Sequence, residues 1–123
     1  MFGLFGNKTT SMDNTTKLKE GLLKKESRHR KVWRERWVVL TELNLYTFEG
    51  QGVYSNPTEV IEVKNIKTVK TDESKSSGFV FKVVTDNFTF FFEAKSFEEK
   101  EGWIGAIGKA MVKTGNQVFI GNV

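Results

Sequence analysis

Between Lys19 and Glu93 the chain alternates apolar and polar residues in short runs, and polar or glycine-containing segments separate these runs. This period-two pattern is typical of half-buried β-strands. It predicts about seven short strands, over residues 19–25, 31–41, 43–49, 58–64, 66–71, 79–85 and 88–93. Only Asp86 and Asn87 separate the last two strands, and such a short connection predicts a hairpin.

After residue 95 the pattern becomes helical. Ser96 is followed three residues later by Glu99, which is the spacing of a capping box at a helix start. Four apolar residues then fall on one helix face: Trp103, Ile107, Ala110 and Met111. Gly115 is a typical helix stop. Three glycines inside the segment weaken the helix by up to roughly 1 kcal/mol each, so packing of the Trp103 face must compensate.

These elements predict a mostly β (α+β) fold. Seven antiparallel strands would form a bent sandwich or a partly open barrel, capped by one C-terminal helix. A chain of 123 residues fits one domain, which we assign to residues 18–114. Residues 1–17 are predicted to be a flexible N-terminal tail and residues 115–123 a C-terminal tail.

The net charge of +4 is unevenly distributed. Residues 17–37 contain nine basic and three acidic residues, whereas the rest of the chain contains ten basic and twelve acidic ones. A basic patch on a slightly acidic body attracts phosphate head groups, nucleic acid or acidic peptides.

The run KVWRERWVVL, residues 31–40, carries the most informative part of this charge. In a strand, Arg34 and Arg36 point the same way as Val38 and Leu40. Trp33, Trp37 and Val39 point the other way. The rigid donor fork of arginine suits phosphate oxygens. The alternative is a solvated charged face, in which the cations pair with Glu20, Glu26 or Glu35.

Several classes of protein find no support in the sequence. There is no cysteine and a single histidine, so we expect no catalytic site, no metal site and no cofactor. No apolar run reaches the length of a membrane span, and the N-terminus lacks the features of a signal peptide. The absence of cysteine fits a reducing compartment, and we expect a cytoplasmic protein.

In order and spacing, four motifs together resemble the pleckstrin-homology (PH) domain family. They are KEGLLKK (residues 19–25), VWRERWVVL (32–40), NLYTF (44–48) and SFEEKEGWIGAI (96–107), the last with the single tryptophan of the family's helix. Within that family, the first strands look most similar to the amino-terminal domain of protein kinase B. The resemblance implies seven strands in two near-orthogonal sheets, with the helix across one corner.

The resemblance also implies a phosphoinositide site built from the first two strands and the loop between them. The implied ligand residues are Lys24 or Lys25, Arg34, Arg36 and Tyr46, with Arg28 and Arg30 in the basic loop. Many strong binders of the family have a further basic residue at the start of the seventh strand, where this chain has Phe88-Thr89-Phe90. We therefore expect moderate affinity.

The leading functional prediction is a monomeric module without enzymatic activity that binds phosphoinositide head groups and is recruited peripherally to anionic membranes. The alternative is a protein-interaction domain of the same fold, in which the basic patch only attracts anionic lipid non-specifically. Nucleic-acid binding is not expected, because Trp33 and Trp37 lie opposite the arginines rather than beside them.

Overall fold

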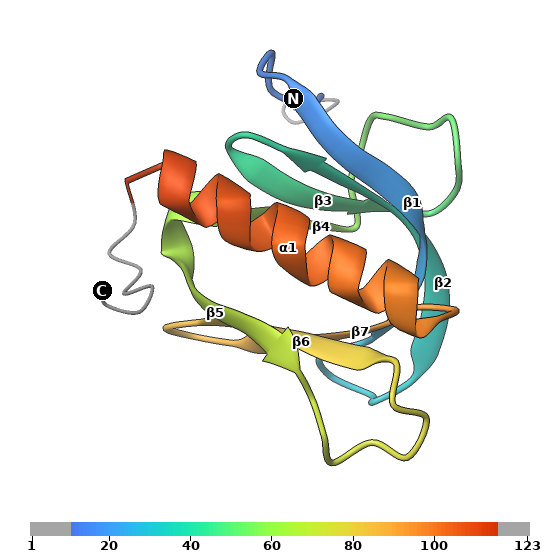
Figure 1. Cartoon of the computed structure of the whole chain (residues 1–123). Coiled ribbons are helices and arrows are strands. Elements are labelled where there is room, and N and C mark those ends of the chain that lie inside the picture. Colours follow the sequence, from blue (N-terminus) through green and yellow to red (C-terminus); the bar gives the residue numbers. More distant parts are fainter. Residues whose placement is uncertain (1–10, 116–123) are drawn as a thin grey trace.

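The computed structural model describes residues 11–115 (Figure 1), in which seven strands form one antiparallel sheet in the order β4-β3-β2-β1-β7-β6-β5. The strands are β1 (Lys17–Glu26), β2 (Trp33–Thr41), β3 (Asn44–Phe48), β4 (Glu59–Glu62), β5 (Ile66–Thr71), β6 (Val80–Thr85) and β7 (Thr89–Glu93). A short 3-10 helix, η2 (Val63–Asn65), joins β4 to β5, and helix α1 (Phe97–Lys113) follows β7. The predicted fold class is thereby confirmed.

The sheet bends strongly at β1. This strand pairs with β2 over nearly its whole length, but with β7 only at Lys24 and Lys25. The two halves of the sheet therefore lie on either side of α1 (Figure 1). Within the described residues β4 and β5 form the two edges and do not pair with each other, so the barrel is open. The hydrogen bonding is that of one continuous sheet rather than two.

The main core fills the space between the sheet and α1. Trp103, Ile107, Ala110 and Met111 are all buried in it, as the helical spacing predicts. The Ser96 hydroxyl accepts a hydrogen bond from the Glu99 backbone N–H at 3.1 Å, which confirms the cap. The helix ends at Lys113, and Gly115 follows with a φ of +81° that favours glycine.

A second, smaller cluster covers the outer face of β2 and β3. It contains Val39, Tyr46 and Phe48, with Trp37 and Met12 packed against them. Residues of β2 and β3 therefore contribute alternately to the main core and to this outer cluster, as the pleat requires.

Asp13 ties the N-terminal segment to this outer face. Its carboxylate accepts hydrogen bonds from the side chains of Tyr46 at 2.8 Å, Thr41 at 2.7 Å and Asn44 at 2.8 Å, and also from Thr15. Residues 11–17, which we assigned to the N-terminal tail, thus contact the sheet. Residues 1–10 and 116–123 of the two predicted tails lie outside the described residues.

The first prediction concerns Trp103, which is 2% exposed. Trp103→Ala should lower the free energy of unfolding by about 3–5 kcal/mol, because it leaves a large cavity under α1. Urea denaturation measures this loss. The control is Phe97→Ala on the same helix, where the ring is 58% exposed and the loss should stay below about 1 kcal/mol. Similar losses for both variants would mean that the helix does not depend on its buried face.

The second prediction concerns acid stability. Burial raises the pKa of Asp13, but the hydrogen bonds from Thr15, Asn44, Thr41 and Tyr46 outweigh it and hold the pKa well below its usual range. A depressed folded-state pKa stabilises the fold above the unfolded-state pKa of about 3.9, and this stabilisation is lost as pH falls below it. Asp13→Asn should therefore be less stable than wild type at pH 7. The difference in free energy of unfolding between the two proteins should be smaller at pH 3.

Urea denaturation at both pH values checks this, with Asp86→Asn as the matched control. Asp86 is exposed and its ion pair with Lys67 is long at 3.8 Å, so loss of the Asp86 charge should change little at either pH. If Asp13→Asn lowers the free energy of unfolding by the same amount at pH 7 and pH 3, the assigned role of the carboxylate is contradicted.

Candidate functional site

A cavity of about 200 Å³ lies beside the β1–β2 loop, and four basic side chains line it. The lining residues are Lys25, Ser27, Arg28, His29, Arg34, Arg36, Thr58 and Glu59. They come from β1, β2, the loop between them, and the start of β4. The arrangement is a concave site with a large excess of positive charge.

The pairing of β1 with β2 explains why the cations converge. In this register Lys25 lies opposite Arg34, and Leu23 lies opposite Arg36. Since side chains alternate along a strand, Arg34 and Arg36 continue the face that holds Val38 in the core. The inward face of β2 is thus apolar under α1 and basic at the cavity.

The loop between these strands is closed by Ser27. Its backbone N–H donates to the Val32 carbonyl at 2.8 Å, and its hydroxyl accepts from the Arg30 and Val32 backbone N–H groups at 3.2 Å and 3.3 Å. Lys31 adopts a left-handed φ of 60° at the return of the loop. These bonds position Arg28 and His29 at the cavity.

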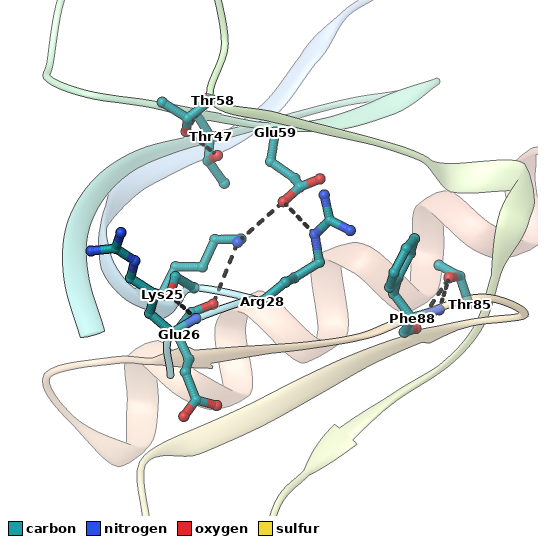
Figure 2. Close-up of polar contacts among 10 residues, drawn as sticks. Lys25, Glu26, Arg28, Thr47, Thr58, Glu59, Thr85 and Phe88 are labelled. Carbon is teal, nitrogen blue, oxygen red and sulfur yellow. Dashed lines mark hydrogen bonds and ion pairs between the residues drawn. The ribbon is translucent and has the colours of Figure 1, made fainter. Parts of the chain in front are cut away.

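Glu59 supplies the counter-charge inside the cavity. Its Oε1 atom lies 3.2 Å from Lys25 Nζ and 3.4 Å from Arg28 Nε, as Figure 2 shows. The Lys25 side chain is only 9% exposed, and a buried ammonium is costly without an anion or other acceptors. Glu59 therefore compensates part of the positive charge of Lys25 and Arg28.

Two aromatic rings of the β6–β7 hairpin lie against cations of the cavity. The Arg28 guanidinium lies over the Phe88 ring at 4.3 Å, and Lys25 Nζ lies 5.6 Å from the centre of the Phe90 ring. Hydrogen bonds between Thr85 and Phe88, at 3.1 Å each, hold the hairpin turn in place (Figure 2). The start of β7, which lacks a basic residue, thus stacks on the cations instead of adding one.

The structure brings together four of the seven predicted ligand residues: Lys25, Arg28, Arg34 and Arg36. Lys24 points to the opposite side of β1, where it lines a separate hollow with Glu35 and Glu93. Arg30 is exposed and does not line the cavity.

Tyr46 does not reach the cavity either. It is 3% exposed in the outer cluster, and its hydroxyl donates to Asp13. A role for this hydroxyl in holding a phosphate does not fit that position, so the prediction for Tyr46 is corrected.

Sequence reasoning missed Glu59 and the aromatic rings that contact Arg28. The alternation of Glu59, Ile61 and Val63 was the available signal, because the last two are buried core residues and Glu59 shares their face. Phe88 and Phe90 carried no such signal, since their contact with Arg28 depends on how the hairpin meets the β1–β2 loop.

Two features are not found among residues 11–115. These residues contain no group of three His, Cys, Asp or Glu side chains placed to hold a metal ion. None of their helices has the length and apolar character needed to cross a bilayer.

Known proteins of the same fold resemble the chain over most of its length. Pleckstrin homology domain-containing protein 1 of Arabidopsis thaliana is 34% identical over 105 residues, covering 81% of this chain and 72% of that protein. The RAC family serine/threonine-protein kinase homolog of Dictyostelium discoideum is 32% identical over 87 residues, which cover 69% of this chain and 19% of that protein.

A solved structure adds information on a ligand. The C-terminal PH domain of pleckstrin, in complex with D-myo-Ins(1,2,3,5,6)P5, superposes with a TM-score of 0.71 and 25% identity, covering 80% of this chain and 99% of that chain. The profile of the PH domain family matches residues 17–112. The chain therefore belongs to the pleckstrin-homology (PH) domain family.

Proposed function

We propose that this PH domain binds phosphoinositide head groups in the Lys25 cavity and is recruited through them to the cytoplasmic face of a membrane. The observation that carries the proposal is the convergence of Lys25, Arg28, Arg34 and Arg36 on one cavity. Two arginine forks and a lysine from adjacent strands suit the oxygens of two neighbouring phosphates. PH domains are in general binding modules rather than enzymes, and the pleckstrin domain with its inositol pentakisphosphate supports the same class of ligand.

The residues of the patch then have different roles. Lys25, Arg34 and Arg36 would contact the head group directly. Lys24 and Arg30, outside the cavity, would contribute diffuse attraction to any anionic surface. The particular likeness of the first strands to protein kinase B remains a prediction, because the kinase homolog is one of several relatives of similar identity.

Glu59 would oppose the ligand. A phosphate that reaches Lys25 and Arg28 must replace a carboxylate already 3.2 Å and 3.4 Å from them. Like charges close together in a partly buried site repel strongly. The free energy gained on binding is the difference between the interaction of these cations with phosphate and their interaction with the Glu59 carboxylate. This is a second reason to expect moderate affinity.

The third prediction tests this competition. Glu59→Gln should tighten the binding of soluble inositol tetrakisphosphate roughly three- to tenfold, or about 1 kcal/mol, because the phosphate no longer displaces a carboxylate. Isothermal titration calorimetry measures the change. The matched control is Glu62→Gln on the same strand, which removes the same charge from an exposed side chain outside the cavity. Equal gains for both variants would show only a general effect of net charge.

The fourth prediction separates the cavity from the surface patch. Arg34→Ala and Arg36→Ala should each weaken inositol tetrakisphosphate binding by roughly 10- to 150-fold, since charge-assisted hydrogen bonds contribute about 1.5–3 kcal/mol. Arg30→Ala, which removes the same charge outside the cavity, should stay within about twofold of wild type. Thermal melts confirm that each variant is folded.

Vesicle sedimentation extends the same comparison to membranes. Attachment to phosphatidylserine vesicles should vanish as salt rises, while attachment to phosphoinositide vesicles should fall but persist, because close ion pairs are screened less. If Arg30→Ala and Arg36→Ala behave alike on both vesicles, there is no specific cavity. A protein-interaction domain with a basic surface would then be the better explanation.

A further inference from the structure

The outer face of α1 is uncovered in the described part of the chain (Figure 1) and carries three glycines, Gly102, Gly105 and Gly108. Each lowers helix stability by roughly 1 kcal/mol relative to alanine. A Cβ atom at Gly105 or Gly108 would meet nothing within 4 Å, so packing inside the domain does not require glycine there. The outer face of the helix is therefore smooth and open at these two positions.

A groove of about 570 Å³ runs beside this face, between α1 and the start of β1. Its floor is formed by small or apolar residues, including Gly102, Gly105, Ala106 and Leu18, of which Leu18 is 38% exposed. Lysines and one glutamate border it. Such a surface allows a second helix to approach closely, since the distance between packed helices depends on the side chains at the contact.

The helix face has acidic residues toward its start and basic residues toward its end, so two antiparallel copies would place opposite charges together. Glu98 and Glu101 lie in the first half of α1 and Lys109 lies in the second half, where Lys113 already pairs with Glu42 at 3.3 Å. Gly105 is the middle residue of the 17-residue helix. Glu101, Gly105 and Lys109 are spaced four apart, so they form one row along the helix surface.

We propose that two copies of this chain associate through α1 as an antiparallel, two-fold symmetric pair that crosses at Gly105. With the four-apart rows of the two helices aligned, at a crossing angle near −50°, Glu101 of each copy faces Lys109 of the other. The two ion pairs and the glycine contact set the orientation of the pair. The proposal is independent of the lipid site, because no residue of the Lys25 cavity takes part.

The association is weak in dilute solution. The ion pairs that would join the two copies come from the exposed residues Glu101 and Lys109, and pairs at an exposed surface contribute little. A dissociation constant on the order of 0.1–1 mM is therefore expected. Confinement of several copies to one membrane surface would raise their effective concentration and favour the pair. The proposal differs from the sequence-based prediction of a monomer, and the oligomeric state measured below decides between the two.

Sedimentation velocity over a concentration series up to about 1 mM tests the proposal on the whole chain. Wild type should shift toward dimer at the upper end. Gly105→Leu should abolish the shift while leaving the melting temperature unchanged or higher, since leucine favours a helix and has room there. Lys109→Glu should also abolish it, whereas Lys95→Glu, the same charge change at an exposed residue before the helix, should not.

Mixing variants gives the most specific result. The Glu101→Lys variant alone should not associate, because it places the new lysine of each copy opposite Lys109 of the other. Glu101 Oε2 lies 2.9 Å from Lys100 Nζ, so a thermal melt checks that the variant is folded. An equimolar mixture with Lys109→Glu should form a heterodimer at least about tenfold tighter than either variant alone, because both ion pairs are then attractive.

Three results would overturn the proposal. The first is wild-type protein that stays monomeric throughout the series. The second is a Gly105→Leu or Lys109→Glu variant that associates as wild type does. The third is a folded mixture that does not associate, which would point instead to an acidic segment of another protein as the occupant of the groove.

Discussion

The pairing of β1 with β2 determines both the core of this domain and its candidate ligand site. One face of β2 carries Val38 and Leu40 into the core and Arg36 and Arg34 into the cavity. A slip of one residue in the register would turn the arginines to the outer face and Trp37 toward the interior. The core thus enforces the geometry of the cations, because a one-residue slip that turns them away also removes Val38 and Leu40 from the main core.

Electrostatics in the cavity follows from this enforced convergence. The strands bring Lys25, Arg28 and two more arginines together whether or not an anion is present. Glu59 relieves part of the repulsion among them, and it comes from β4, the edge strand, rather than from β1 or β2. Stability of the domain and the proposed affinity for a phosphate therefore make opposite demands on Glu59.

Most of the fold could be predicted from the sequence, because strand alternation and helix spacing are local signals. The hairpin at Asp86-Asn87, the Ser96 cap and the buried Trp103 face are examples that the structure confirms. The anchoring of Asp13 to Tyr46 was not predictable in this way, since it joins residues 33 positions apart through a polar network.

The candidate site was predictable only in part, for the same reason. Arg34 and Arg36 could be placed because their strand also carries core residues. Alternation along β3 places Tyr46 on the other face of the strand from Leu45, and the structure buries these two residues in different clusters. The family resemblance instead implied a phosphate contact for Tyr46. Contacts between separate loops, such as Arg28 with Phe88 or Glu59, need the tertiary structure.

The stacking of Arg28 on Phe88 has a consequence for the entropy of binding. A free arginine side chain carries about 2 kcal/mol of rotamer entropy, which a ligand must restrict when it orders the side chain. Here the ring at 4.3 Å and the Glu59 carboxylate already restrict the guanidinium during folding. In the proposed complex, a phosphate would take the place of Glu59 as the partner of a cation that is already ordered, because Arg28 loses its conformational freedom during folding.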